Sequence, residues 1–296
     1  MEKTILVAGA TGNLGEKLCY ELLKRGAAVR AAVRFGSDNN KIKLLKDAGI
    51  EVVEVDFTSH SMLENACSGV SCVVSALAGL KDVIVDTQAA LLNAAVSAGV
   101  PHFIPSDFCT DYTNLPEGCN RNFDLRKAFA EIIDSSPIHA TSVFNGAFSY
   151  VLHYDIPLLN TNHKTIGFFE DKSDWNIDFT TLENTAAFTA SAALDSDAPR
   201  YLRIAGFSIS PEALLPVAEK VYKSSFQLEN MGSMERFLET IYTLRREQPE
   251  GENELYPAWQ QMQYLYSMFA AHHQELDNER YSGIVWIGAE EALSKR

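Results

Sequence analysis

The chain has 296 residues, of which 46% are hydrophobic and 22% are charged, a composition typical of a globular protein with a sizeable core. Its net charge of −14 disfavours binding to nucleic acid or to an anionic membrane surface, because like charge repels phosphate groups. No apolar stretch reaches the roughly 18 residues that a membrane-spanning helix needs, and the N-terminus lacks a signal-peptide pattern. We therefore expect a cytoplasmic protein that does not bind membranes.

The cysteines and histidines give no sign of a metal centre. Five cysteines are scattered along the chain without a Cys-x-x-Cys pair, which indicates neither a disulfide framework nor a zinc ribbon. Reduced and mostly buried thiols are the expected state. The adjacent residues His272 and His273 are expected on the solvated face of a helix, so we predict no metal site.

The N-terminal segment predicts a phosphate-binding loop. Thr4 to Ala8 is a continuous apolar run that suits a strand buried on both faces of a parallel sheet, and Leu14 to Lys24 has leucines at helical spacing. Between them, GATGNLG (Gly9 to Gly15) has a glycine at every third position. Glycines let the backbone approach a pyrophosphate, and the helix N-terminus offers unpaired N–H groups. The spacing differs from the standard G-x-G-x-x-G, and a tight turn without a ligand is the alternative interpretation.

The second predicted strand, Ala28 to Arg34, indicates which dinucleotide is favoured. An acidic residue at its end would bind the ribose 2′-hydroxyl of NAD and would repel a 2′-phosphate. The strand instead ends in Arg34, and Lys41 and Lys43 follow, so we expect NADP(H) rather than NAD. A solvated charge at the strand end is the alternative interpretation of Arg34.

The alternation of strands and helices continues to about residue 145. Further strands are predicted at Glu51 to Asp56, Cys72 to Ala76, His102 to Pro105 and Ala140 to Phe144, and further helices at Asn40 to Ala48, Ser61 to Cys67, Val83 to Ala98 and Asp124 to Ser135. This α/β pattern predicts a doubly wound parallel sheet (a Rossmann fold) with its ligand crevice at the carboxyl ends of the strands. We expect residues 1–145 to form a dinucleotide-binding domain.

Residues 146–296 are expected to form a smaller, mixed and helix-rich substrate lobe, whose elements can interleave with the Rossmann sheet. Its first part is dense in aromatic residues, namely Phe148, Tyr150, Tyr154, Phe168, Phe169, Trp175 and Phe179. These rings suit either core packing or a pocket for a planar substrate. A helix-rich tail follows from Pro211 to about Glu275, with a break at Gln248 to Asn253.

Four segments of the sequence resemble the NmrA-like and isoflavone reductase-like group of atypical short-chain dehydrogenases. They are GATGNLG, HFIPSDF (His102 to Phe108), FDLRKAFAEIIDSSPIHATSVFNGAF (Phe123 to Phe148) and DNERYSG near the C-terminus. The Tyr-x-x-x-Lys motif of typical short-chain dehydrogenases occurs only at Tyr20 to Lys24, directly behind the glycine loop, and we interpret it as a coincidence.

The resemblance implies which residues bind the cofactor. In that family the glycine loop cradles the NADPH pyrophosphate, the arginine after the second strand binds the 2′-phosphate, and a P-S-[DE]-F segment lies beside the nicotinamide. The matching residues are Gly9, Thr11, Gly12, Asn13, Leu14 and Gly15 in the loop, Arg34 and Lys43 at the 2′-phosphate, Ser75, Ala76 and Leu77 on the adenosine side, and Pro105, Ser106 and Phe108 on the nicotinamide side.

The same resemblance raises a question about catalysis. The reductases of the family place a lysine shortly after the P-S-[DE]-F segment, where it holds the nicotinamide ribose and assists proton transfer. Alignment without a gap puts Arg126 at that position, and Lys127 follows. Arginine stays protonated and cannot act as a base, although it can bind an oxyanion or a ribose hydroxyl. Lys127 could replace it only after a rotation of about 100° around the helix.

Two functions are compatible with these features. The first is an NADPH-dependent reductase that transfers hydride to a small, aromatic or enone-bearing compound. The second is a non-catalytic NADP(H)-sensing regulator of the NmrA type, which the absent Tyr-x-x-x-Lys motif and Arg126 favour. In both cases we expect a monomer or homodimer whose ligands are small molecules.

Overall fold

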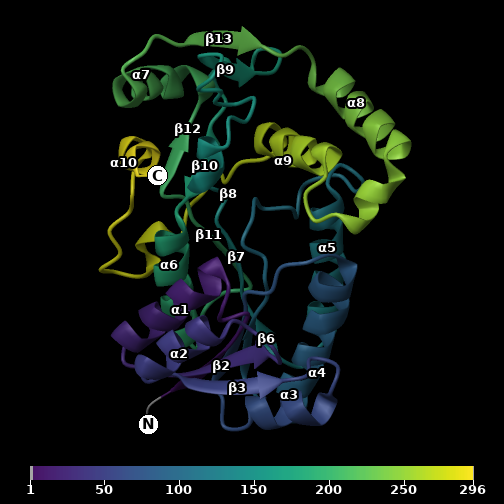
Figure 1. The fold of residues 1–296 in the computed structure, drawn as a ribbon, viewed down its shortest axis with the longest axis vertical. Coiled ribbons are helices and arrows are strands. Elements are labelled where there is room, and N and C mark those ends of the chain that lie inside the picture. The colour runs from purple at the N-terminus through teal and green to yellow at the C-terminus, as the bar shows by residue number, and fades with distance from the viewer. Residues whose placement is uncertain (1–2, 296) are drawn as a thin grey trace. The chain divides into compact units, whose positions relative to one another are not determined.

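A parallel sheet of six strands, in the order β3-β2-β1-β4-β5-β6, forms the centre of the first structural unit (Figure 1). The computed structural model describes residues 3–295. The strands are β1 (Thr4–Ala8), β2 (Ala28–Arg34), β3 (Glu51–Val55), β4 (Cys72–Ser75), β5 (His102–Ile104) and β6 (His139–Ala140). This strand order is that of the Rossmann fold, which confirms the predicted fold class.

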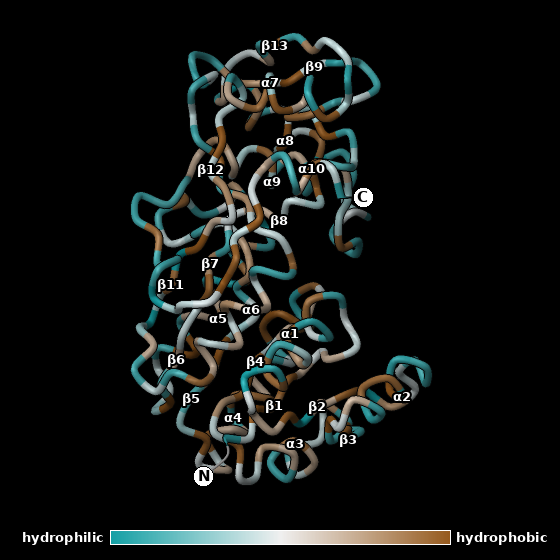
Figure 2. Tube along the Cα trace, turned by 90° about the vertical axis from the view of Figure 1, so that its left-hand side faces the viewer, coloured by the Kyte–Doolittle hydropathy of each residue, from teal (hydrophilic) through white to brown (hydrophobic). Residues whose placement is uncertain are grey.

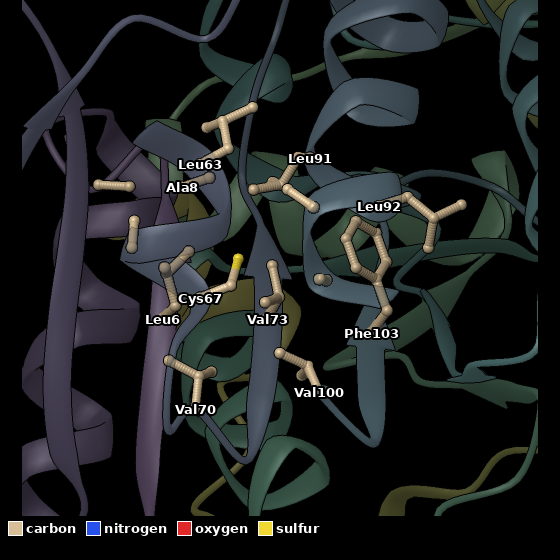
Figure 3. Packing of buried hydrophobic residues seen from close by; sticks show 14 of the residues in the cluster. Leu6, Ala8, Leu63, Cys67, Val70, Val73, Leu91, Leu92, Val100 and Phe103 are labelled. Carbon is tan, nitrogen blue, oxygen red and sulfur yellow. The ribbon is translucent and has the colours of Figure 1, made fainter. Parts of the chain in front are cut away.

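Helices flank this sheet, whose inner strands β1 and β4 are apolar and buried on both sides. They are α1 (Asn13–Lys24), α2 (Asn39–Asp47), α3 (His60–Cys67), α4 (Gln88–Ser97), α5 (Arg121–Asp134) and α6 (Leu182–Leu194). Figure 3 shows one layer of the resulting core, in which Leu6 and Val73 of the strands pack with Leu63 of α3 and Leu91 of α4. The helix predicted over Val83 to Ala98 is instead a π-helical turn, η1 (Asp82–Thr87), followed by α4.

The last predicted strand, Ala140 to Phe144, is two shorter strands. β6 pairs with β5, whereas β7 (Ser142–Phe144) forms a separate two-stranded sheet with β11 (Tyr201–Arg203). The partner changes at Thr141, whose N–H still donates to the Phe103 carbonyl, while the Ser142 N–H donates to the Arg200 carbonyl at 2.8 Å. An apolar run alone does not reveal such a change of hydrogen-bonding partner.

Two structural units interleave along the chain. The first comprises Met1–Phe108, Leu125–Val143 and Thr185–Leu202, and the second comprises Cys109–Asp124, Phe144–Asn184 and Arg203–Arg296. The sequence predicts a boundary near residue 145, with later elements able to interleave with the Rossmann sheet. Most of α6 groups with the first unit, where the Arg25 guanidinium beyond α1 donates to the Ser191 hydroxyl at 3.0 Å.

Within residues 3–295, two small sheets and four complete α-helices lie in the second unit. One sheet has the order β12 (Phe207–Ile209), β10 (Ile177–Thr180) and β8 (Ala147–Phe148), and the other pairs β13 (Gln227–Asn230) with β9 (Thr165–Phe168). The helices are α7 (Pro211–Tyr222), α8 (Met234–Glu247), α9 (Ala258–Ala270) and α10 (Ala289–Ser294). The predicted break in the helical tail is a 3-10 turn at Pro249–Asn253.

The aromatic residues of this unit divide into two groups. Phe169 and Phe179 are fully buried in a core with Ile166 and Phe269. Tyr150 and Tyr154 are exposed by 40% and 70%. Core packing therefore accounts for Phe169 and Phe179, and a pocket for a planar substrate stays a prediction for the exposed rings. Figure 2 colours the trace by hydropathy and shows how apolar and polar stretches alternate along it.

A buried histidine links the stability of the first unit to pH. The His102 Nε2 atom lies 3.0 Å from the Thr141 hydroxyl, and its ring packs perpendicular to that of His139. Burial, with a smaller contribution from His139, lowers the pKa of His102 from 6.5 to about 4. The folded protein therefore keeps this ring neutral at pH values where the unfolded chain protonates it.

We predict that this difference destabilises the protein in mild acid. The folded pKa lies below the unfolded one, so the stability is complete above about pH 6.5 and falls as the pH decreases toward 4. Between pH 7 and pH 5 the loss attributable to His102 is about 2 kcal/mol. Urea unfolding of the His102→Gln variant should show a pH dependence smaller by that amount, whereas His60→Gln, at an exposed position, should leave it unchanged. Equal pH dependence in all three proteins would contradict the prediction.

Candidate functional site

The loop between β1 and α1 has a different structural reason for each of its three glycines. Gly9 has φ = +84°, and a Cβ there would lie 2.7 Å from the Ala76 carbonyl oxygen beyond β4. A Cβ on Gly15 would lie 2.2 Å from the Gly9 oxygen, so helix α1 and the loop touch at that point. A Cβ on Gly12 would meet only the Gly9 oxygen, at 3.2 Å. The first and third glycines thus permit close packing within the protein, and the second keeps the outer side of the loop open.

The open side of the loop suits an anion. Gly12 is the N-cap of α1 and provides no side-chain acceptor for the N–H groups of the first turn. Gly12 and Asn13 are exposed, and Thr11 and Leu14 are half-buried. Unpaired N–H groups at a helix N-terminus, together with its positive dipole end, favour a bound phosphate. The loop therefore has the geometry that a pyrophosphate requires.

Basic residues lie beside this loop at the end of β2. Arg34 is exposed at the last position of the strand. The Lys41 Nζ atom donates to the Thr11 carbonyl at 2.7 Å, which places its ammonium group at the glycine loop. Lys43 lies 3.7 Å from Asp47 along helix α2, with 78% of its side chain exposed. Of the two lysines, Lys41 is the one that contacts the loop.

The end of β4 lies directly against the glycine loop. The Ala76 N–H donates to the Ala8 carbonyl at 2.8 Å, and the Ala76 carbonyl oxygen is the atom closest to Gly9. The Ser75 hydroxyl is fully buried, with no hydrogen-bond partner among residues 3–295. Leu77 is half-buried. The loop and the end of β4 therefore adjoin where the strand order reverses, which is where doubly wound sheets bind ligands.

The predicted segment after β5 is held at three atoms of Ser106. Its N–H donates to the Gln88 side-chain oxygen at 2.9 Å, its hydroxyl donates to the Leu77 carbonyl at 2.7 Å, and its carbonyl accepts from Arg126 Nε at 3.1 Å. Pro105, Ser106 and Phe108 are buried. The structure therefore brings the residues expected on the adenosine side and on the nicotinamide side into contact through Ser106 and Leu77.

Arg126 and Lys127 are both half-buried on α5. Arg126 contacts the segment after β5 through the Ser106 carbonyl, and its place beside the nicotinamide stays a prediction. Lys127 is the next residue of the helix, so its side chain leaves the axis about 100° away. The direct contact with the P-S-D-F segment is thus made by a guanidinium group.

Sequence reasoning missed two buried polar residues of this region. Gln88 is fully buried at the start of α4, and Asp107 is 1% exposed and accepts a hydrogen bond from the Ser142 hydroxyl at 2.7 Å. The Ser142 oxygen in turn accepts from Arg200 at 2.7 Å. A lone glutamine in the apolar run QAALLNAAV was the available signal, because a buried polar side chain needs hydrogen-bond partners.

The prediction for His273 was wrong. Its side chain is buried in the second unit, after the end of α9, and its N–H donates to the Asp178 carboxylate at 2.6 Å. His272 is exposed and packs its ring against Trp175. Among residues 3–295 no group of three or more His, Cys, Asp or Glu side chains is placed to hold a metal ion, and no helix is long and apolar enough to cross a membrane. All five cysteines are buried and none forms a disulfide.

Comparison with known proteins identifies the family of this fold. A model of the NmrA-like family matches residues 1–282. The chain belongs to the NmrA-like family.

Several of the similar curated proteins are named as reductases. The chain is 32% identical to pinoresinol reductase 2 of Arabidopsis thaliana over 161 residues, and 29% identical to isoflavone reductase of Pisum sativum over 167 residues. These matches cover 50% of this chain and 50% and 52% of the two relatives, so the chain spans about half the length of the curated relatives it matches.

Solved structures share the whole fold. A crystal structure of isoflavone reductase superposes with a TM-score of 0.81 at 20% identity, covering 100% of this chain and 99% of the other. A structure of AtPrR2 with NADP+ and (+)pinoresinol gives a TM-score of 0.78 at 22% identity and covers 99% and 98% of the two chains. At these identities the likeness establishes the fold and not the ligand.

The glycine loop yields a stability prediction. Gly15→Ala should lower the free energy of unfolding by about 1 to 3 kcal/mol or more, because its Cβ would overlap the Gly9 carbonyl. Gly12→Ala should change it by about 1 kcal/mol or less, the usual difference between glycine and alanine at an N-cap. Chemical denaturation measures both. A similar loss in the two variants would mean that the open side of the loop is packed.

Proposed function

We propose that this protein is an NADPH-dependent reductase of a small aromatic or enone-bearing compound. The single observation that carries the proposal is the pairing of an open, glycine-lined helix N-terminus with Arg34 at the end of the adjacent strand. The family membership and the reductase activities named for its relatives support it.

The dinucleotide fits the residues of the first unit. The loop from Gly9 to Gly15 can approach a pyrophosphate at Gly12, which is exposed and carries no side chain. Arg34 and Lys41 supply positive charge for a 2′-phosphate, since Lys41 already contacts the loop, and Lys43 takes at most a secondary role. The adenosine half would rest on the residues after β4 and the nicotinamide half on those after β5.

The bound dinucleotide supplies the hydride, and the protein supplies positioning and electrostatic support. Arg126 remains protonated and is held against the Ser106 carbonyl, so it can orient a ribose hydroxyl or stabilise negative charge that develops on a substrate oxygen. It cannot remove a proton. Proton transfer would then use water or a network that includes the Ser106 hydroxyl.

A group of tyrosines in the second unit supports an aromatic substrate. Phe148 and Tyr150 stack with ring centroids 5.6 Å apart, and Tyr154 lies 6.0 Å from Tyr150. Tyr256, whose side chain is 55% exposed, is one of the neighbouring tyrosines that raise the pKa of Tyr150. Burial and the neighbouring tyrosines raise the pKa of Tyr150 to about 12, so its phenol stays protonated and can donate a hydrogen bond at neutral pH. Such accessible ring faces suit a planar ligand with oxygen substituents.

One observation favours a second function, a regulator that senses NADP(H) without turning it over. The residue at the position of the family's catalytic lysine is Arg126, and its guanidinium is already engaged by a backbone carbonyl. A regulator needs the dinucleotide site and not the proton donor. This reading predicts NADPH binding without NADPH oxidation in the presence of any compound in a panel of enones, quinones and isoflavonoid-like molecules.

Cofactor preference tests the proposed function. The wild-type protein should bind NADPH clearly more tightly than NADH, because charge-assisted contacts to the 2′-phosphate contribute roughly 1.5 to 3 kcal/mol each. Arg34→Ala should reduce the preference by about tenfold or more, and Arg236→Ala, at a basic position of the second unit, should not alter it. Calorimetry with both cofactors measures the effect. Equal binding of NADPH and NADH by the wild-type protein would refute the proposal.

Turnover separates the roles of Arg126 and Lys127. With a substrate found in the panel, Arg126→Ala should lower kcat by roughly 10-fold to 1,000-fold, the upper value being typical of losing one oxyanion donor. Lys127→Ala is the matched control on the same helix and should have little effect. The reverse ranking would mean that the register is wrong by one residue, and no effect of either variant would remove both from the catalytic assignment.

A further inference from the structure

Gln88 is a fully buried polar residue for which the proposed chemistry has no direct use. It is the first residue of α4 and follows directly after the π-helical turn η1. Its neighbours along the helix, from Ala89 to Leu92, are apolar. Burial of an amide without hydrogen-bond partners costs free energy. The hydrogen bonds that the Gln88 side chain makes therefore indicate what this residue does.

The π-helical turn orients this amide. The Gln88 backbone N–H donates to the carbonyls of Val83 and Val85 and so passes over that of Ile84, its usual α-helical acceptor. The Gln88 Nε2 atom donates to the Ile84 carbonyl instead, at 2.7 Å. The side chain thus takes the place of the missing backbone bond. With its nitrogen facing a carbonyl, its oxygen must face the other way.

That oxygen accepts the Ser106 N–H at 2.9 Å. Ser106 also donates its hydroxyl to the Leu77 carbonyl, in the chain segment that leads from β4 to η1. This segment is tightly packed, since a Cβ on Gly79 would lie 2.4 Å from the Val83 side chain. Gln88 and Leu77 therefore hold Ser106 from two sides. One hydrogen bond therefore joins the segment after β5 to the segment after β4, and a second joins it to the start of α4.

We infer that Gln88 is a positioning residue that sets where the end of β5 lies and thereby orders the support for the nicotinamide half of the dinucleotide. The inference rests on the proposed function and adds to it a residue outside the glycine loop. Its geometry requires one donor and one acceptor on a side chain of this length, which an apolar residue cannot provide and a protonated glutamate can.

Binding of whole and partial cofactors tests the inference. Adenosine 2′,5′-bisphosphate carries the adenosine half with its 2′-phosphate and lacks the nicotinamide. By calorimetry, Gln88→Met should weaken NADPH binding about tenfold and change the affinity for adenosine 2′,5′-bisphosphate by less than twofold. Gln263→Met is the matched control, because Gln263 is also fully buried and accepts a backbone N–H, that of Arg121 in the second unit. It should leave the ratio of the two affinities unchanged.

The Gln88→Glu variant gives an independent readout through pH. Its protonated carboxyl group can donate to Ile84 and accept from Ser106, whereas its ionised form repels the Ile84 carbonyl. Relative to wild type, its NADPH affinity should therefore rise several-fold between pH 7.5 and pH 5.5, and its affinity for adenosine 2′,5′-bisphosphate should follow the wild type. This arm applies even where Gln88→Met does not fold.

Three outcomes would overturn the inference. Equal weakening of both ligands by Gln88→Met would make Gln88 a general structural residue, and unchanged NADPH binding would remove its role. A Gln88→Glu variant that matches wild type at every pH would show that the donor to Ile84 is irrelevant. Failure of the wild-type protein to bind either ligand would instead overturn the proposed function itself, and a single wild-type titration distinguishes that case.

Discussion

Close backbone contact where β1 and β4 end is the constraint on which the rest of the site depends. At this point the strand order reverses, and the chain after β1 must turn into α1 while touching the chain after β4. The contact between Gly9 and the Ala76 carbonyl leaves no room for a side chain, and Gly15 meets the Gly9 carbonyl from the helix side. Only with both contacts in place does the N-terminus of α1 face outward at Gly12.

The same region shows how a parallel sheet makes a binding surface from separate strand ends. Strand ends in one sheet are neighbours, and hydrogen bonds beyond the strands can link the segments that follow them. Here Ser106 supplies those links, through its hydroxyl to Leu77, its N–H to Gln88 and its carbonyl to Arg126. Asp107 adds a buried connection to Ser142. Rigidity of this kind lowers the cost of ordering the site when a ligand binds.

The features that sequence reasoning found are those with local causes. The bounds of β1 and β2 and the start of α1 follow from apolar runs and from the glycines between them, so the predicted strands Thr4 to Ala8 and Ala28 to Arg34 match the structure residue for residue. The glycine loop between β1 and α1 was equally accessible, because the strand, the turn and the helix that define it are contiguous.

The features that it missed depend on contacts between distant residues. The choice between Lys41 and Lys43 depends on which one reaches Thr11, about thirty residues away in the sequence. The role of Gln88 depends on its hydrogen bond with Ser106. His273 is buried where its backbone N–H donates to the carboxylate of Asp178 in β10. The division of the last strand into β6 and β7 depends on the Arg200 carbonyl. In each case the sequence shows the residue type but does not show which distant residue it contacts.

Arg126 changes what the site can do chemically compared with a lysine there. An ammonium group with a shifted pKa can release and recover a proton near neutral pH, whereas a guanidinium cannot. The fixed charge has a compensating property, because a planar donor already held by the Ser106 carbonyl through Nε keeps its remaining N–H groups in a defined plane. A reaction in this site would therefore rely on electrostatic stabilisation of an oxygen and would draw its proton from solvent or from a neutral hydroxyl. Substrates whose reduced form accepts a proton easily from water suit such a site better than substrates that need a strong general acid.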